Sequence, residues 1–415
     1  MYINRKRRQI IRMSDLSWNI VLVVYMILAL EYDLYNFFGM GFVISGTVLT
    51  MIEILLLLAV VLMTKHRVKA HYIMYLFLLL GIAGTYLFSP ECSEYLHMFF
   101  WEGSSLKKVF LLPLAVQCIN RADKFVDKLY MFSVIEGYIH IICNAIWGYG
   151  YTEWGVFNYM TYGMALITPT CLVMQRVFSR PTKCNVLTLT IFELNIILYG
   201  HRGALLVTII MSAIFFLKYV KTTKKIYIGL AGAFVLLLLF IFKTQIIGIV
   251  IDLMQTLNLE SRTLEKFLTG DITNDSERNI IWGFMVQGII RNFPFGNGIG
   301  AERILLGNSM REGLYAHNFI LEICYNYGAV IGGIVVISIF TAVYKSLKYI
   351  QDEEWYRLIV SFLVPSVLTL MTSASIYQYW MFWLSMGFYF CYFGRRWNSG
   401  NRSCIRVVRK RLKNE

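Results

Sequence analysis

The hydrophobic residues of this chain gather in runs of about 20 residues, which recur from one end of the sequence to the other. An α-helix of about 20 apolar residues is long enough to cross the roughly 30 Å hydrocarbon core of a bilayer. The pattern therefore predicts an all-α polytopic membrane protein, a single transmembrane domain that covers residues 1–415. The twelve predicted spans are 15–32, 37–63, 71–89, 106–120, 126–147, 156–177, 184–200, 202–218, 226–250, 317–343, 357–375 and 378–394.

The polar segments between the spans predict the orientation, because lysine and arginine gather in the cytoplasmic loops of membrane proteins. The N-terminus, the C-terminal tail and alternate loops fall on one face, and these segments hold 29 of the 39 basic residues. We therefore expect an even number of spans, with both termini in the cytoplasm.

Composition agrees with a membrane protein. Hydrophobic residues make up 57% of the chain, charged residues 15%, and the mean hydropathy is +0.58, outside the range of soluble globular proteins. The net charge of +14 comes mostly from the basic residues of the predicted cytoplasmic segments. These residues attract anionic membrane lipids, so the charge does not require a nucleic-acid partner.

The N-terminal apolar stretch is span-length and has no small-residue cleavage site, so we expect no cleaved signal peptide. The eight cysteines show no metal-ligand spacing and predict no disulfide framework.

Two external segments interrupt the compact pattern of spans. The shorter covers residues 90–105, and the longer covers residues 251–316, between the ninth and tenth predicted spans. Long ordered loops commonly carry function. Within the long loop, "NDSERNIIWGFMVQGIIR" predicts a helix that begins after an N-cap at 274–276 and ends at Arg291. That helix is too short to span, so we expect it to lie in the interface or to pack over the bundle.

Arginine is enriched in the long loop. Residues 251–316 contain one lysine and five arginines, whereas the cytoplasmic segments hold 15 arginines and 14 lysines. The planar guanidinium group binds phosphate oxygens in pairs, which lysine does not do. An anionic ligand on the outer side is one interpretation, and pairing with the acids of the loop is the alternative. The five are Arg262, Arg278, Arg291, Arg303 and Arg311.

Another arginine lies at a tight junction between two predicted spans. Arg202, in "YGHRGALL", follows one apolar run and begins the next. An unpaired guanidinium group in hydrocarbon costs several kcal/mol, so Arg202 either extends toward the lipid headgroups or binds the phosphates of a lipid-linked substrate at the outer edge of the membrane.

Few ionisable residues fall inside the predicted spans. Glu136 and His140 are four residues apart on one helical face, and we expect them to bind each other. Glu53 and Glu193 either join helices or line a substrate channel, and the sequence leaves both interpretations open.

The glycine-rich turn "NFPFGNGIG" differs from the known phosphate loops. No parallel strand precedes it, which excludes a Rossmann or P-loop motif. Its backbone amides remain candidates for contact with a ligand. No His, Cys and carboxylate cluster has zinc-ligand spacing, so we expect neither a metal nor another cofactor.

Three motifs now follow in order: "HRGALL" at an outer junction, "FPFGNGIG" in the long loop, and "HN" followed by Gly328. In this order and on this side of the membrane they resemble the bacterial O-antigen polymerase and ligase family. The family's Arg-x-x-x-Leu appears as Arg202 and Leu206, and its His-polar-x9-Gly begins at His317. The matched region runs from about 190 to 335, a third of the chain.

The resemblance implies a metal-independent glycosyltransferase in the bacterial cytoplasmic (inner) membrane, with its active site facing outward. It implies an undecaprenyl-diphosphate-linked oligosaccharide as substrate, and a chain-length regulator and a flippase as partners. A polysaccharide polymerase of capsule or O-antigen biosynthesis is our first hypothesis. An O-antigen ligase, which transfers the glycan to the lipid A core of lipopolysaccharide, is the alternative, and a flippase for lipid-linked sugars is a distant one.

Such chemistry requires cations for the departing diphosphate and a base for the acceptor hydroxyl. We assign Arg202 and Arg278 to the diphosphate, with Arg291 next. We assign His317 as the catalytic base, because imidazole accepts a proton at neutral pH and a helix N-terminus favours its neutral form. The candidate supporting residues are Asn318, Glu322, Gly296, Gly298 and Gly300. Asn318 alternatively caps the helix, and Glu322 lies about 140° round the helix from His317.

Overall fold

The computed structural model is helical throughout the part of the chain that it describes, which confirms the predicted all-α class. The described residues are 2–31, 33, 46–63, 70–102, 106–119, 122–148, 159–199, 202–220, 248–249, 252, 277–310 and 314–411. Among them, four helices are long and apolar enough to cross a membrane. They are α7 (Ala122–Trp147), α10 (Arg202–Tyr219), α17 (Ala329–Tyr349) and α18 (Glu353–Thr372).

The structure thus supports a helical membrane protein, but it does not confirm twelve spans. Helices α1 (Tyr2–Ala29), α3 (Gly46–Met63) and α4 (Ala70–Phe88) also carry apolar stretches, which within the described residues cover Leu16–Ala29, Thr50–Met63 and Leu78–Phe88. Most of the predicted span at 226–250 lies outside the described residues.

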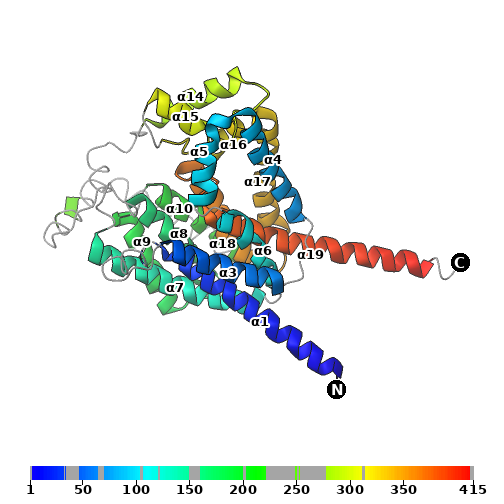
Figure 1. Ribbon diagram of the computed structural model, residues 1–415. Coiled ribbons are helices and arrows are strands. Elements are labelled where there is room, and N and C mark those ends of the chain that lie inside the picture. The colour runs from blue at the N-terminus through cyan, green and yellow to red at the C-terminus, as the bar shows by residue number, and fades with distance from the viewer. Residues whose placement is uncertain are drawn as a thin grey trace.

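Helices α1 and α7 run in the same direction, and α19 (Trp380–Arg411) runs against them. Trp18 packs against Phe125 near the start of α7, while the Tyr25 hydroxyl lies 3.1 Å from Ser133 further along. Trp380, at the start of α19, packs against Tyr25. The first residues of α1 and the last residues of α19 therefore leave the bundle at the same end (Figure 1).

Helix α18 lies in the centre of the bundle, since nearly all of its side chains are buried. It packs against α8 (Tyr159–Ser179) and α10, and α9 (Lys183–Tyr199) packs against α8. The Tyr219 hydroxyl at the end of α10 donates a hydrogen bond to Glu353 Oε1 at the start of α18 (2.7 Å). Helices α10 and α18 are therefore antiparallel, so the start of α10 lies at the end of the bundle where α18 finishes.

The described parts of the predicted external loop at 90–105 and of the predicted span at 106–120 form a series of short helices. The series returns from the end of α4 to the opposite end of the bundle, where Arg395 Nη2 donates to the Gln117 carbonyl oxygen (2.9 Å). Apolar content alone did not show that "PECSEYLHMFFWE" is helical. The pieces are η1 (Pro90–Cys92), α5 (Ser93–His97), η2 (Met98–Glu102), η3 (Leu106–Leu111), α6 (Leu112–Ala115) and η4 (Val116–Cys118).

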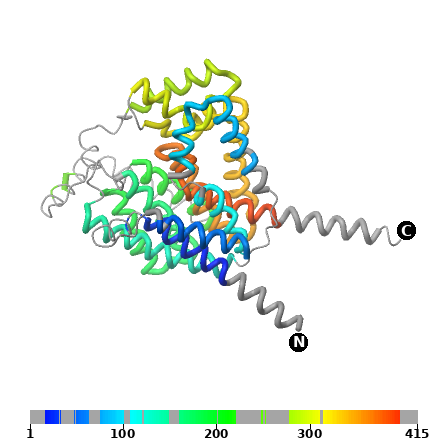
Figure 2. The backbone as a smooth tube through the Cα atoms, in the orientation of Figure 1, coloured from blue at the N-terminus to red at the C-terminus, as the bar shows by residue number. Residues whose placement is uncertain are grey.

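Three helices form an outer layer at one edge of the molecule, beside the ends of α4 and α17 (Figure 2). They are α14 (Arg278–Arg291), α15 (Ala301–Ser309) and α16 (Phe319–Tyr327). Helix α14 ends at Arg291 as predicted and packs over α16.

The predicted span at 317–343 is wrong as a single helix, because the chain turns sharply at Gly328. This residue has φ +86°, a conformation that side chains other than glycine rarely adopt. After the turn α17 packs closely on α16: a Cβ atom added to Gly332 would lie 2.7 Å from the Cys324 Cα atom. The apolar pattern continues across Gly328, so hydropathy joins two helices that the backbone separates.

Candidate functional site

His317 lies in the segment that enters α16, and its backbone is in the left-handed region with φ +50°. Asn318 follows as the N-cap: its side-chain oxygen accepts hydrogen bonds from the amides of Ile320 (2.9 Å) and Leu321 (3.4 Å). Asn318 therefore caps α16, which was the alternative to its predicted supporting role in the site. A left-handed backbone at a residue other than glycine stores about 1–3 kcal/mol of strain and is typical of functional sites.

The imidazole of His317 is held against an aromatic ring. Its centroid lies 3.8 Å from that of Tyr315, with the two planes inclined at 36°. The Tyr315 hydroxyl donates to the carbonyl oxygen of Ser373, in the link between α18 and α19. The guanidinium carbon of Arg303 lies 4.8 Å from the ring centroid of Tyr315. Arg303, Tyr315 and His317 thus form a connected group of a cation, a phenol and an imidazole.

Two carboxyl groups are buried beside this group. Glu302 Oε1 lies 3.7 Å from Arg303 Nε, and Glu322 accepts hydrogen bonds from Ser375 Oγ (2.5 Å) and from the Ile376 amide (3.1 Å). Burial, together with the smaller effect of the neighbouring Glu302, raises the pKa of Glu322 to about 8. Burial also raises the pKa of Glu302, which Arg303 opposes. The carboxyl group of Glu322 therefore connects α16, through two hydrogen bonds, to the link between α18 and α19.

Arg278 is at the start of α14, near the same group. The indole Nε1 of Trp282, one turn further on, donates to the carbonyl oxygen of Ala316 (3.1 Å), which fixes this end of α14 beside His317. Burial raises the pKa of Tyr315 to about 12, and the charges of Arg303 and then Arg278 oppose the rise. Both guanidinium groups are therefore within electrostatic reach of the Tyr315 hydroxyl.

Arg291 is at the other end of α14, about 20 Å away along the helix axis. It is exposed, and its charge acts on Tyr325, near the end of α16, rather than on Tyr315. Arg278 and Arg291 are therefore at opposite ends of α14, and only the end that carries Arg278 is fixed beside His317. The structure thus separates two arginines that the sequence assigned to one role.

Arg202 is the first residue of α10 and is partly buried. Because α10 and α18 are antiparallel, it lies at the end of the bundle where Ser373 accepts the hydrogen bond from Tyr315. The structure therefore places Arg202 and His317 at the same end of the bundle, from two regions more than 100 residues apart in sequence.

The glycine-rich turn packs on the end of α16, and the amides of residues 297–299 donate to groups of α16 and α4. The amides of Asn297 and Gly298 donate to the carbonyl oxygens of Tyr325 (3.0 Å) and Asn326 (3.1 Å). The Ile299 amide donates to Thr85 Oγ1 (2.8 Å). A Cβ atom added to Gly296 would lie 2.2 Å from the Asn326 carbonyl oxygen. Gly296, Gly298 and Gly300 thus support the site through close packing, with Gly298 and Gly300 also at positive φ.

Glu136 and His140 belong to a longer buried chain than the sequence predicted. Glu136 Oε1 lies 3.9 Å from His140 Nε2, and Asp33 Oδ2 lies 2.7 Å from His140 Nδ1 on the other side. The Tyr25 hydroxyl donates to Glu136 Oε2 (2.6 Å). His140 therefore lies between two carboxyl groups and links α7 to the chain just beyond α1.

The other two acidic residues of the predicted spans also have protein partners. Glu53 binds the buried ammonium group of Lys107, which lies 3.6 Å from Glu31 Oε1. Glu193 Oε2 accepts a hydrogen bond from Thr208 Oγ1 (3.1 Å), between α9 and α10. Of the two interpretations, these contacts favour the joining of helices.

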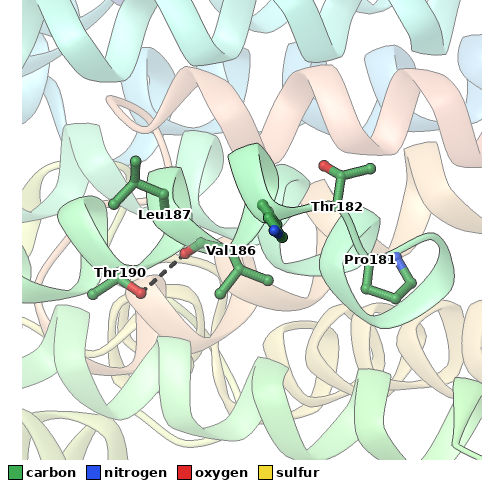
Figure 3. Close-up of a pocket in the computed structure, with 6 residues that line it drawn as sticks. Pro181, Thr182, Val186, Leu187 and Thr190 are labelled. Carbon is green, nitrogen blue, oxygen red and sulfur yellow. Dashed lines mark hydrogen bonds between the residues drawn. The ribbon is translucent and has the colours of Figure 1, made fainter.

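A hollow lies at the turn between α8 and α9 (Figure 3). Its volume is about 540 Å³, and it is lined by Pro181, Thr182, Lys183, Val186, Leu187 and Thr190. The Thr190 hydroxyl donates to the Val186 carbonyl oxygen (3.0 Å). Because α9 runs from this turn toward Arg202, the hollow is at the opposite end of the bundle from His317. No group of three His, Cys, Asp or Glu residues in the described part of the chain is arranged to hold a metal ion.

No protein-family model, curated protein or solved structure matches the chain. The resemblance to the O-antigen polymerase and ligase family therefore stays a prediction that rests on the sequence motifs. Glu302 and Tyr315 were missed from the sequence, and Arg303 was only counted with the other arginines. Nothing in their spacing shows that they are packed beside His317.

Proposed function

We propose that this chain is a metal-independent integral-membrane glycosyltransferase that polymerises lipid-linked oligosaccharide repeat units. The growing glycan passes from undecaprenyl diphosphate to the next lipid-linked unit on the outer face of the bacterial cytoplasmic membrane, in capsule or O-antigen biosynthesis. The observation that carries the proposal is the contact of the His317 imidazole with the Tyr315 ring, which the guanidinium group of Arg303 also contacts, beside the start of α14 where Arg278 lies.

In the proposed reaction, a hydroxyl oxygen of the acceptor sugar forms a bond to the anomeric carbon of the donor glycan. The bond from that carbon to the diphosphate oxygen breaks, with inversion, and the electron pair leaves with undecaprenyl diphosphate. The hydroxyl proton passes to His317, for which a fixed imidazole is suited. Arg278 stabilises the departing diphosphate, and Arg202, at the same end of the bundle, is a second candidate for that role.

Two features support chemistry rather than packing at this place. The His317 backbone is in the left-handed region although the residue is not glycine, and such strain is typical of functional sites. The Arg303 guanidinium group is buried between the rings of Phe99, at 5.3 Å, and Tyr315. Burying a cation is unfavourable unless its surroundings compensate, and here it fixes the ring that holds the imidazole.

The length distribution of the surface glycan in a strain without this gene tests the proposal. A polymerase predicts that only single repeat units remain on the lipid or on the core. Return of the long chains with the wild-type gene, but not with a His317→Ala gene that expresses equally, would assign the activity to this site. Long chains in the deletion strain with normal attachment would contradict the proposal.

An O-antigen ligase uses the same chemistry with the lipid A core as acceptor, and the same deletion distinguishes it. Full-length chains would then remain on undecaprenyl diphosphate. A lipid-linked sugar flippase is favoured by one observation, the buried series of Asp33, His140 and Glu136, because ionisable groups within a bundle are typical of transport pathways. A flippase predicts repeat units that accumulate on the cytoplasmic leaflet.

A further inference from the structure

The turn after α14 carries large apolar side chains that the rest of the described protein leaves uncovered. Ile290, Phe293 and Phe295 are 69%, 64% and 77% exposed. The exposed Arg291 lies among them. We call these four residues the α14 turn patch. Exposed aromatic side chains in such a group are typical of an interaction surface.

The backbone of this turn is fixed, so the side chains are held outward. The Phe295 amide donates to the carbonyl oxygen of Asn292 (2.8 Å), and the Phe293 amide donates to that of Ile290 (3.3 Å). The side chains of Asn292 and Asn297 are hydrogen-bonded across the turn. The patch is therefore a rigid protrusion of the outer layer.

The position of the patch is set by its contact with the start of a candidate membrane span. A Cβ atom added to Gly328 would lie 2.2 Å from the Pro294 carbonyl oxygen, so the turn touches the residue that precedes α17. Helix α17 then begins with exposed apolar side chains, Val330 and Ile331, each about half exposed. The patch thus lies beside the first turn of a candidate membrane span.

A second apolar helix ends beside the same turn. A Cβ atom added to Gly298 would lie 3.0 Å from Ser89 Cβ, and Ser89 follows Phe88, the last residue of α4, which is 85% exposed. The outer ends of α4 and α17 therefore flank the turn (Figure 2). The patch continues the apolar surface that these helices present to lipid.

We propose that the α14 turn patch docks into the outer leaflet of the bilayer. Phe293 and Phe295 lie in the interfacial region that aromatic residues prefer, Ile290 lies below the headgroups, and Arg291 binds lipid phosphate. A lipid surface is favoured over a protein partner because the patch is continuous with lipid-facing helices and because its cation matches the phosphate layer. This inference does not depend on the proposed glycosyltransferase activity.

Light-induced crosslinking of the full chain in lipid nanodiscs tests the proposal. Phe293 or Phe295 is replaced by p-benzoylphenylalanine, in discs of phosphatidylethanolamine and phosphatidylglycerol, and the protein mass is measured after irradiation. The substitution keeps an aromatic side chain, and the two positions serve as independent probes. Ile334, a 61% exposed residue of α17, is the positive control, and Asn308, an exposed residue of α15, is the negative control.

We expect a mass increase of one phospholipid at positions 293 and 295, as at 334, and none at 308. Adducts at 334 without adducts at 293 and 295 would overturn the proposal. Adducts at 293 and 295 with a second protein chain would also overturn it and would assign the patch to a protein interface.

Discussion

The ring of Tyr315 contacts both the imidazole of His317 and the guanidinium group of Arg303, and its hydroxyl donates a hydrogen bond to the carbonyl oxygen of Ser373. Tyr315 and Ser373 are 58 residues apart. Because Ser373 is in the link between α18 and α19, the orientation of the imidazole depends on the packing of the central helix. Tyr315 is thus a positioning residue for His317.

Removing the imidazole should abolish activity without unfolding the protein. General base catalysis contributes about 10²- to 10⁴-fold, so we expect His317→Asn to lower kcat by at least about 100-fold. Asparagine tolerates the left-handed backbone better than most residues, which makes this variant a fair test. Polymer formation from purified lipid-linked repeat units measures the loss, and an unchanged melting temperature is the control. Full activity of this variant would exclude His317 as the base.

The ring and the hydroxyl of Tyr315 should contribute differently. Tyr315→Phe keeps the ring against His317 but removes one hydrogen bond, which is worth about 0.5–1.5 kcal/mol in stability, so we expect a lower melting temperature and nearly normal kcat. Tyr315→Leu removes the ring, and we expect kcat to fall by about tenfold or more, since a misplaced catalytic group loses rate steeply. The imidazole position should also change in Tyr315→Leu, measured by the His317 NMR signals. Equal kcat in the two variants would show that the ring does not position His317.

The two ends of α14 should differ in their effect on substrate binding. Arg278 is at the end of α14 that Trp282 fixes beside Ala316, whereas Arg291 is about 20 Å further along the helix axis. We expect Arg278→Ala to lower kcat/KM by about 10²-fold, as for loss of one donor to a leaving group, and Arg291→Ala to change it by less than about threefold. The matched variants are compared in the same polymerisation assay. A larger loss from Arg291→Ala would place the diphosphate at the other end of the helix.

Local features of the sequence predicted local features of the structure. The apolar runs gave α7, α10 and α18 within a few residues, and the residue type and position of Asn318 indicated its capping role. In contrast, the turn at Gly328 depends on one backbone angle inside a continuous apolar run. Hydropathy does not record that angle, so the sequence merged α16 with α17.

The candidate site was predicted only where a residue stands out by its own chemistry. His317 and Arg278 are ionisable residues at predicted helix starts, and the sequence identified both. Tyr315 is one of 27 tyrosines, and its importance comes from a contact with Ser373 that only the folded chain makes. Glu302 was missed for the same reason, since its burial beside Arg303 follows from how α15 packs on α16.

Stability should fall as pH rises through neutrality because of Glu322, which lies outside the candidate membrane spans. Burial raises its pKa to about 8 in the folded state, with Glu302 adding to the rise, from about 4.3 when unfolded. The folded state thus binds a proton more tightly, so this contribution is complete below about pH 4 and is lost as pH rises to about 8. We expect the free energy of unfolding to decrease by a few kcal/mol across that window. Glu322→Gln should flatten the decrease, measured by chemical unfolding in detergent, and an unchanged slope would contradict this assignment.

The sharp turn between α16 and α17 should tolerate no side chain at its centre. Gly328→Ala places a Cβ atom 2.2 Å from the Pro294 carbonyl oxygen. Residue 328 also has φ +86°, a backbone conformation essentially restricted to glycine. In other residues this conformation costs about 1–3 kcal/mol, in addition to the clash. We expect the variant to lose at least about 2 kcal/mol of stability and to displace the glycine-rich turn that packs there. Gly333→Ala is the matched control, because no atom lies within 4 Å of its added Cβ and alanine favours a helix over glycine by about 1 kcal/mol. Thermal unfolding of both variants in one detergent measures the difference. Equal melting temperatures would show that α16 and α17 join as one continuous helix, as hydropathy alone predicts.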